Sequence, residues 1–301
     1  MKQIFRYILF VLAGAFILAS CHDFKDDNMV DDTVYLRSSD DGLVQEVSVY
    51  DQVVRFGVIK SGKGRSACTV QLGIDSGDKL FDYNEEHETG FVSLARKWYN
   101  ADELEDKQVT FSPEDARVKV DVKWDPFDMV GLMLTETDDF VIPVYIKSSS
   151  ITVNEKKSLL LIRPVLSTLS VRAADNAMTC KEESTFTAKV GVKLDHAIPG
   201  HDVRVNLSFS PKAMTVNGIS YEAAPSGSIN LVSSEVIIKA GDFESDVEVD
   251  LDMTGVPGSV KYVSGVIRID SAAVVIEDGE DINFIPVVQD EMAVRVTKTA
   301  K

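Results

Sequence analysis

Apolar and polar residues alternate along most of this chain, and this period of two limits what it can fold into more than any other feature. The run CTVQLGI at residues 68–74 alternates cleanly, and so does VKVDV at residues 118–122. Because successive side chains of a β-strand point to opposite faces, such alternation is typical of strands with one face on a core. Long helical periodicity is missing, and only residues 85–105 could hold a short helix or an irregular excursion. The alternation therefore predicts an all-β protein.

Short turn sequences separate these alternating runs. They combine Gly, Pro, Ser and Asp, as in SGKG at 61–64, DSGD at 75–78 and SPED at 112–115. Further strands are expected at residues 53–58, 109–111, 144–146, 186–192, 203–207, 236–238, 247–251, 266–269 and 293–296. Many short strands with turns between them are typical of antiparallel β-sandwiches.

The second half of the chain repeats the pattern of the first half. VTFSPED followed by VKVDV resembles VIIKAGD followed by VEVDL, and in both halves an aromatic residue then opens a strand that ends in small polar residues. We interpret this as a diverged duplication of one sandwich, although any two β-sandwiches share such strand and turn spacing. A length of 301 residues also suggests about two domains. The expected fold is all-β, with two tandem immunoglobulin-like antiparallel β-sandwich domains at residues 34–166 and 167–301.

The first 20 residues have the layout of a secretory signal peptide. Lys2 and Arg6 precede an apolar run from Ile8 to Ala19, which is short for a membrane span of about 20 residues. The junction LASC resembles the lipobox of bacterial lipoproteins, in which the cysteine becomes the first mature residue and carries acyl chains. Residues 1–20 are therefore expected to be a lipoprotein signal peptide and Cys21 the lipid attachment residue. The alternative is a helix that stays in the membrane as an anchor.

Residues 21–33 are expected to form an acidic tether. The sequence HDFKDDNMVDD follows Cys21 and is hydrophilic, so one interpretation is a solvated linker that holds the domains off the membrane. The stretch also looks like the acidic export signal that sends Bacteroidetes-type lipoproteins to the outer face of the outer membrane. The expected localisation is an outer membrane lipoprotein that is exposed at the surface and held in outer-membrane lipid through acylated Cys21.

Charge and cysteine content exclude two classes of protein. The chain has 48 Asp and Glu against 31 Lys and Arg, a net charge of −17, whereas a nucleic-acid-binding groove needs clustered Lys and Arg for phosphate contacts. Three cysteines are too few for a disulfide scaffold. Cys68 lies in phase with Val70 and Leu72 and is expected to be buried as a small hydrophobe. A bridge from Cys68 to Cys180 would need Cα atoms within about 7 Å.

The strands of the first half resemble a known family. VTFSPED, then VKVDV, then FVIPVYIKSS resembles the N-terminal immunoglobulin-like domain of Bacteroidetes surface lipoproteins, a domain of unknown function found beside glycan-utilisation systems. The resemblance covers about residues 34–166 and is loosely repeated over 169–297. It implies an accessory role beside outer-membrane importers and chitinase-like endo-glycosidases. That family often continues into a carbohydrate-binding-type module, in whose place this chain has a second sandwich.

No catalytic motif stands out in the sequence. SGKGRS at 61–66 lacks the spacing of a phosphate loop, and no Gly-x-Ser-x-Gly elbow occurs. Glycosidases use two carboxylates, but with 48 acidic residues a neighbouring pair is unavoidable and indicates nothing. We therefore expect a protein that is not an enzyme and needs no cofactor.

Two kinds of residue group could bind a cation. His196 and His201 flank a turn beside two aspartates, and residues 138–139 and 277–281 are rich in the carboxylates that Ca²⁺ prefers. The histidines offer too few ligands, and the acidic segments lack the alternating spacing of a calcium loop. Solvated turns are the simpler interpretation, and no metal site is expected.

Exposed aromatic side chains are candidates for glycan binding, because the C–H face of a pyranose packs on a π face. The candidates are Trp98, Tyr99, Trp124 and Phe127. Trp98 and Tyr99 lie in the most irregular stretch of the first half. Trp124 continues the inward face of the strand at 118–122, so core packing is the simpler interpretation of that residue.

The sequence is compatible with two functions. The leading one is a non-catalytic, lipid-anchored cell-surface protein that serves as an accessory glycan-binding or complex-assembly module of a polysaccharide-utilisation system. Its partners would be glycans or an outer-membrane import complex, and not nucleic acid. The alternative is a structural or adhesive pilus-type subunit or anchor protein, assembled by strand addition to an open edge. A separable strand at residues 293–296 would serve that alternative.

Overall fold

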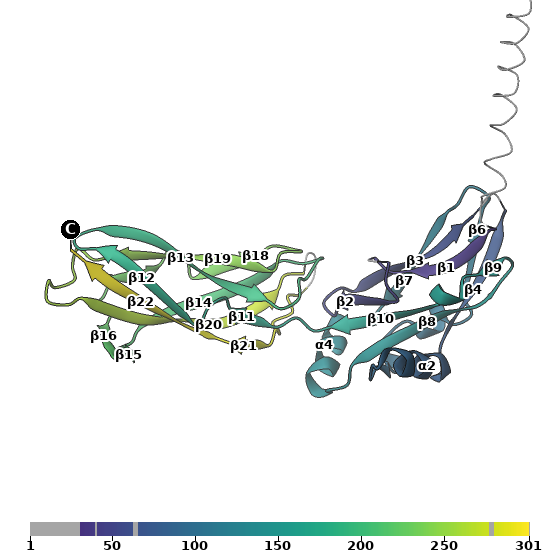
Figure 1. Cartoon of the computed structure of the whole chain (residues 1–301), viewed down its shortest axis with the longest axis horizontal. Helices are drawn as coiled ribbons and strands as arrows, with labels where there is room; N and C mark the ends of the chain where they lie inside the picture. Colours follow the sequence, from purple (N-terminus) through teal and green to yellow (C-terminus); the bar gives the residue numbers. More distant parts are fainter. Residues whose placement is uncertain (1–30, 40, 63–65, 277–279, 301) are drawn as a thin grey trace, which may run out of the picture. The chain divides into compact units, whose positions relative to one another are not determined.

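A computed structural model describes residues 31–39, 41–62, 66–276 and 280–300 of the chain (Figure 1). The expected signal peptide, Cys21 and most of the tether lie outside these residues.

The chain divides into two compact units. Unit 1 comprises the chain up to Gln45, Val53–Lys123 and Asp138–Arg163, and unit 2 comprises Glu46–Gln52, Trp124–Thr137 and the chain from Pro164 on. Residues 46–52 and 124–137 thus group with unit 2, although the boundary drawn from the sequence assigns them to the first domain.

The first sandwich, strands β1 to β10, consists of two sheets. One has the order β7-β3-β1-β9, and the other has the order β2-β10-β8-β4-β6 with β5 beside β8. The strands are β1 Thr33–Arg37, β2 Val44–Ser48, β3 Val53–Ser61, β4 Cys68–Ile74, β5 Val92–Ser93, β6 Gln108–Phe111, β7 Arg117–Lys123, β8 Phe140–Ser149, β9 Thr152–Val153 and β10 Leu159–Val165. The inward side chains Phe56, Leu72 and Ile142 are fully buried, as period-two alternation requires.

In the described part of the first sandwich, five short helices connect these strands. They are α2 Asp78–His87, η1 Arg96–Trp98, α3 Ala101–Leu104, α4 Pro126–Thr135 and η2 Glu155–Lys157. The expected helix within 85–105 is found in part, because α2 begins earlier and α3 lies inside that range. After Trp124 the chain does not enter an irregular loop, because α4 begins at Pro126.

The start of α4 has a recognisable signal in the sequence. The Asp125 side chain accepts hydrogen bonds from the N–H groups of Phe127 and Asp128, at 2.9 and 3.3 Å, and Pro126 occupies the first turn. An aspartate at the N-cap followed by proline is a favoured way to begin a helix. The signal is only two residues long, and it follows a strand whose alternation dominates the local pattern.

The second sandwich, strands β11 to β22, also consists of two sheets. One has the order β17-β19-β13-β11-β21, and the other has the order β12-β22-β20-β14-β18 with β16 beside β20 and β15 beside β16. The strands are β11 Leu169–Val171, β12 Asp175–Lys181, β13 Thr185–Leu194, β14 Val203–Pro211, β15 Met214–Val216, β16 Ile219–Ala223, β17 Ile229–Leu231, β18 Glu235–Ile238, β19 Glu244–Asp252, β20 Tyr262–Val274, β21 Val287–Gln289 and β22 Glu291–Thr299. The fold is all-β with two tandem immunoglobulin-like sandwiches, as expected.

The two sandwiches share one topology. The order β7-β3-β1-β9 recurs as β19-β13-β11-β21, and β2-β10-β8-β4-β6 recurs as β12-β22-β20-β14-β18. Even the parallel pair β1–β9 recurs, as β11–β21. A register shift interrupts β4–β8 between Gln71 and Leu72, and β14–β20 has one between Asn206 and Leu207. The common strand order and the matching bulges agree with the duplication inferred from the sequence.

In both sandwiches, an arginine side chain packs closely against a glycine of a strand. A Cβ atom on Gly57 of β3 would lie 2.9 Å from Nε of Arg117, and one on Gly191 of β13 would lie 2.7 Å from Cζ of Arg172. A side chain at either position would therefore displace the guanidinium that lies across the strand. Gly in a strand interior is otherwise unfavourable, and it often marks such a close approach.

Among the described residues, each sandwich also buries one lysine. Lys60 is 4% exposed, and its ammonium donates to the carbonyl oxygens of Ser66 and residues 112–113 at 2.9–3.2 Å. Lys298 in the second sandwich donates in the same way to the carbonyls of residues 256–257, at 3.1 and 2.6 Å. Because a buried charge is tolerated only when it is well hydrogen-bonded, each lysine fixes the turns that surround it.

The two described cysteines, Cys68 and Cys180, are both buried and free. The expectation that Cys68 is buried is confirmed. Within the described part of the chain, no helix is long and apolar enough to span a membrane.

Replacement of the buried lysine tests how the first sandwich is held together. Lys60→Ala is expected to lower the free energy of unfolding by about 3 kcal/mol, because it leaves buried carbonyl groups without a donor. The matched control is Lys119→Ala, since Lys119 is exposed on β7 and its loss should change stability by less than about 0.5 kcal/mol. Urea unfolding of the soluble chain from residue 22 on, followed by circular dichroism, measures both. Equal stability of the two variants would contradict the role assigned to Lys60.

Candidate functional site

Two of the four aromatic candidates are buried. Tyr99 and Trp124 are each 7% exposed. The indole N–H of Trp124 donates to the carbonyl oxygen of Val49 at 3.1 Å, and burial raises the pKa of the Tyr99 hydroxyl to about 12. Neither ring presents a free face, so the structure removes Tyr99 and Trp124 as glycan platforms. Core packing, the simpler interpretation of Trp124, is what the structure shows.

The other two candidates are accessible but belong to different units. Trp98 in η1 is half-buried, and the Lys97 ammonium lies 4.6 Å from the centroid of its ring. Phe127 in the first turn of α4 is 52% exposed. Trp98 is part of unit 1 and Phe127 is part of unit 2. Their roles as glycan contacts stay predictions.

The groups considered for a cation are engaged in other interactions. Asp139 forms a bidentate pair with Arg163, at 2.7 and 2.9 Å. His196 lies 3.3 Å from Asp195, which accepts hydrogen bonds from the N–H and hydroxyl of Thr168. In the parts of the chain that the structure describes, no three His, Cys, Asp or Glu side chains are placed to hold a metal ion. Residues 277–279 of the second acidic segment lie outside those parts.

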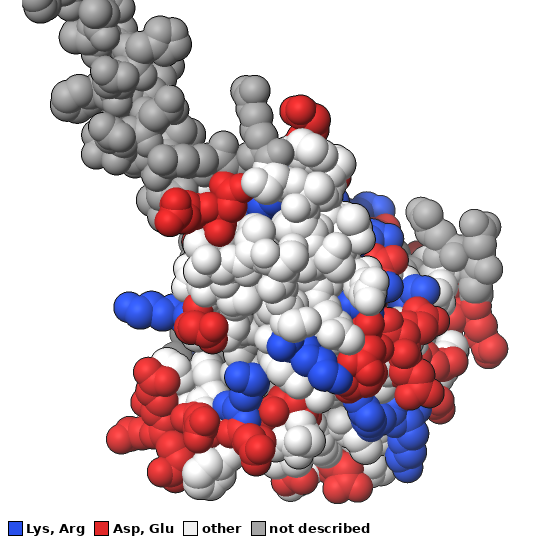
Figure 2. Space-filling model, turned by 90° about the vertical axis from the view of Figure 1, so that its right-hand side faces the viewer, with Lys and Arg blue, Asp and Glu red and all other residues white. Residues whose placement is uncertain are grey.

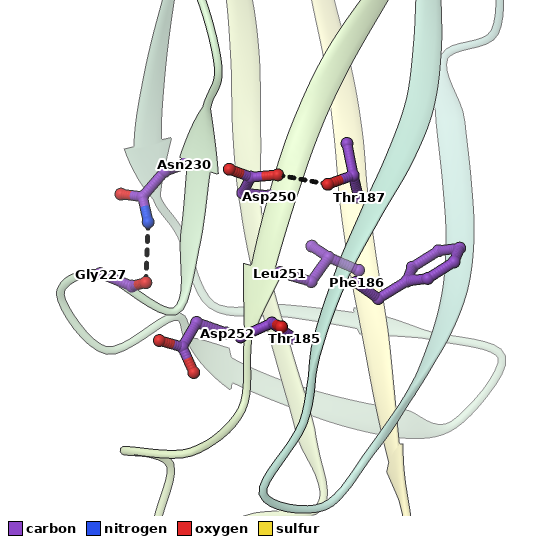
Figure 3. Close-up of a pocket in the computed structure, with 8 residues that line it drawn as sticks. All are labelled: Thr185, Phe186, Thr187, Gly227, Asn230, Asp250, Leu251 and Asp252. Carbon is purple, nitrogen blue, oxygen red and sulfur yellow. Dashed lines mark hydrogen bonds between the residues drawn. The ribbon is translucent and has the colours of Figure 1, made fainter.

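An open depression lies on the second sandwich over β13, β17 and β19 (Figure 3). Its volume is about 460 Å³, and it is lined by Thr185, Phe186, Thr187, Gly227, Asn230, Asp250, Leu251 and Asp252. The pairing of the strands brings its polar side chains together. Asp250 on β19 pairs with Thr187 on one side and with Asn230 on the other. These three polar residues therefore form one row across three strands, and the row faces outward because the neighbouring Leu251 is fully buried.

Hydrogen bonds hold the side chains of this depression in place. The Thr187 hydroxyl donates to Asp250 at 2.6 Å, and the amide of Asn230 donates to the carbonyl oxygen of Gly227 at 2.7 Å (Figure 3). Asp252 accepts from the hydroxyl and the N–H of Thr254, which lowers the pKa of its carboxyl group. Both carboxylates can accept several hydrogen bonds each. The row is thus pre-arranged to accept hydrogen bonds from the hydroxyl groups of a ligand.

The charge of the depression favours some ligands over others. Two of its eight lining residues are acidic and none is basic, so an anionic ligand would be repelled. Acidic side chains are common elsewhere on the surface as well. Figure 2 shows one face of the molecule, where Asp and Glu gather in several groups with Lys and Arg between them. On this face the acidic side chains are therefore divided among several groups and are not concentrated in one site.

Sequence reasoning missed this row for a physical reason. Thr187, Asn230 and Asp250 are far apart in the sequence, and only the pairing of β13, β19 and β17 brings them together. Each lies at an outward position of its strand, where a polar residue is expected on any half-exposed sheet. No local signal distinguishes them from ordinary solvated positions.

Comparison with known proteins gives one family match and several distant structures. A family model that describes an N-terminal domain matches residues 28–153, which is less than half of the chain. No curated protein matches the chain. Among solved structures, the calcium-binding domain CBD12 of CALX1.1 has a TM-score of 0.38 at 12% identity, and the match covers 88% of this chain and 99% of that chain. CBD12 from CALX1.2 has a TM-score of 0.41 at 10% identity, with the same coverage of 88% and 99%.

A third structure comes from Bacteroides ovatus ATCC 8483. It is described as a candidate carbohydrate-binding protein, and it has a TM-score of 0.32 at 12% identity, covering 86% of this chain and 71% of that chain. The family match falls on the first sandwich, which is the part of the chain whose strands resemble the N-terminal domain of Bacteroidetes surface lipoproteins.

The different burial of the two tryptophans can be measured directly. The chain has only Trp98 and Trp124. The variant Trp98→Phe therefore leaves Trp124 as the fluorescent reporter, and Trp124→Phe leaves Trp98. The Trp124 reporter is expected to emit at shorter wavelength and to resist acrylamide quenching, because its ring is buried. The Trp98 reporter should emit at longer wavelength and be quenched more strongly. The reverse order would contradict the burial of Trp124.

Proposed function

We propose that this protein is a non-catalytic, lipid-anchored cell-surface protein whose second sandwich binds glycans as an accessory module of a polysaccharide-utilisation system. The observation that carries the proposal is the open depression of Figure 3, where Asp250 and Asn230 are held outward in a fixed row. Sugar hydroxyls are good donors to carboxylate and amide oxygens. An open sheet face of this kind also leaves room for a chain that continues on both sides.

The acid–base properties of the depression support binding over hydrolysis. Hydrolysis of a glycosidic bond needs one carboxyl group that is kept protonated by a raised pKa. The pKa of Asp252 is lowered by the hydrogen bonds from Thr254, so this group is ionised at neutral pH. It can accept hydrogen bonds from hydroxyl groups, but it is a poor proton donor.

The proposal that the protein is anchored at the surface rests on the N-terminal sequence. The signal-like residues 1–20, the lipobox cysteine at position 21 and the acidic stretch that follows support an outer membrane lipoprotein facing outward. Several acyl chains on one cysteine give stable anchoring, because each buried CH₂ contributes about 0.8 kcal/mol.

The pilus-type alternative would be served by a separable strand at residues 293–296. These residues lie inside β22, which pairs with β12 on one side and with β20 on the other. Release of this strand would break both ladders, so it adds no support to that alternative. The end strands of this sheet are β12 and β18.

Glycan binding is tested with a panel of soluble polysaccharides in affinity electrophoresis. Asp250→Ala is expected to weaken binding of uncharged polysaccharides about tenfold, because a hydrogen bond to a charged group contributes about 1.5–3 kcal/mol. The matched control is Glu248→Ala, which removes the same charge from the next outward position of β19, outside the depression. Absence of binding to every glycan would contradict the glycan-binding role. Release of shorter products from a bound glycan would contradict the non-catalytic role.

The lipid anchor is tested by Cys21→Ser in the producing cell. The variant is expected to leave the membrane fraction, because a serine cannot carry the thioether-linked lipid of a lipoprotein. Cys68→Ala removes a different cysteine and should stay with the membrane. Digestion of intact cells with an added protease reports exposure at the surface. Membrane retention of Cys21→Ser would contradict lipid anchoring, and protection from the protease would contradict surface exposure.

A further inference from the structure

The second sandwich has another depression on its other sheet, over β14 and β20. Its volume is about 320 Å³, and its lining includes Arg204, Asn206, Asp270, Ser271 and Phe284. The Figure 3 depression lies over β13, β17 and β19, which belong to the opposite sheet of the same sandwich. The two depressions therefore open on different faces of one domain.

A β-bulge builds the floor of this second depression. Asn206 pairs with Ser271 and the next residue, Leu207, pairs with Ile269, so Asp270 is an extra residue without a partner in the register. Successive strand residues normally point to opposite faces, yet Asp270 and Ser271 are both exposed. Bulges re-aim side chains in this way and are common beside functional sites. Two consecutive polar groups thus become available on the outer surface.

Short hydrogen bonds fix the polar side chains around the bulge. The Asn206 amide donates to Ser271 Oγ at 2.9 Å, and the Ser208 hydroxyl donates to Asp270 at 2.8 Å. The Arg204 guanidinium donates to Asp281 at 3.0 Å. Each of these groups has further donors or acceptors to offer a ligand. Because their positions are already fixed, a ligand that matches them loses little binding energy to side-chain ordering.

An exposed aromatic ring stands beside these polar groups. Ile282 and Ile285 are buried, and Ile282 exchanges two backbone hydrogen bonds of 3.0 Å with Val274 of β20. These anchors hold the segment against the sheet, while Phe284 between them is 58% exposed. Exposure of a large apolar ring beside hydrogen-bonding groups is the arrangement that packs the C–H face of a sugar and binds its hydroxyls at the same time.

The charges around the depression select against anionic ligands. Arg204 is the cation of the group, and its Nε atom lies 3.7 Å from a carboxylate oxygen of Glu235 while Nη1 contacts Asp281. Asp270 adds a third carboxylate. One positive and three negative charges leave the surroundings negative, so sulfated or uronic-acid sugars are disfavoured.

We propose that this depression is a binding site for an uncharged pyranose, with Phe284 packing on the sugar ring and Arg204, Asn206 and Asp270 bonding its hydroxyls. The inference rests on the proposed glycan-binding function and gives it a second site and a class of ligand. The second sandwich then contacts glycan on two opposite sheets.

At the equivalent bulge of the first sandwich, the polar side chains bond to one another. Ser148 donates to the Gln71 amide oxygen, and the Gln71 amide N–H and the Lys147 ammonium both donate to Asp106. Lys147 also lies 3.7 Å from Glu105. In the first sandwich, the side chains at the bulge thus form hydrogen bonds and ion pairs with one another. In the second sandwich, the equivalent bulge borders a depression with an exposed aromatic ring.

Two phenylalanines of the same sandwich provide the test. Phe284 and Phe243 are both 58% exposed, but Phe243 does not line the depression. The probes are cellohexaose, mannohexaose, maltohexaose and xylohexaose, with polygalacturonate as the anionic comparison, in calorimetric titrations of the soluble chain. For the oligosaccharide that binds, Phe284→Ala is expected to weaken affinity at least about tenfold, and Phe243→Ala by less than about twofold. Asp270→Asn should also weaken binding without a change in melting temperature.

The outcomes separate this inference from the proposed function. Binding that is weakened by Asp250→Ala while Phe284→Ala behaves like Phe243→Ala would overturn the second site and leave the proposed function standing. Absence of binding to all four oligosaccharides by the wild-type chain, together with binding of polygalacturonate, would overturn the assignment of an uncharged ligand. No binding of any probe or polysaccharide would overturn both. Loss of binding in Phe284→Ala and Asp270→Asn, with both variants folded, supports the site.

Discussion

Burial of every second side chain between two sheets is the constraint on which the rest of this structure depends. Inward residues such as Phe56 and Val249 are fully buried, so they are committed to the core of their sandwich. Only outward positions, bulges and connecting segments are then free to carry recognition. Both depressions of the second sandwich follow this rule. One is a row of outward side chains across three strands, and the other combines a bulge with a neighbouring segment.

The two sandwiches meet this constraint with the same strand order but with different outer surfaces. The sandwiches share strand order, the position of a bulge and a glycine that lies under an arginine. Their outer surfaces differ, because in the first sandwich Gln71 and Lys147 at the bulge bond to Asp106. In the second, Asn206 and Asp270 border an open depression. The scaffold is therefore the same in both sandwiches while the exposed positions differ, as expected when the core determines the fold and the surface determines the ligand.

The strands could be predicted from the sequence because alternation is a local signal. The run at 118–122 falls within β7, and the burial of Cys68 followed from its phase. Pairing is not local. Nothing near residues 293–296 indicates that β22 lies between β12 and β20, and nothing near Asp250 indicates that Thr187 and Asn230 lie beside it. The burial of Tyr99 could not be predicted for a related reason, since it depends on what packs over an irregular segment.

We propose that the outward faces of the second sandwich bind uncharged glycan. Chemical-shift mapping of backbone amides during a titration with an uncharged oligosaccharide tests it most directly. The account predicts shifts that gather around residues 204–206, 270–271, 283–285 and the row of Asn230 and Asp250. Shifts confined to the first sandwich, or none at saturating sugar, would contradict the account.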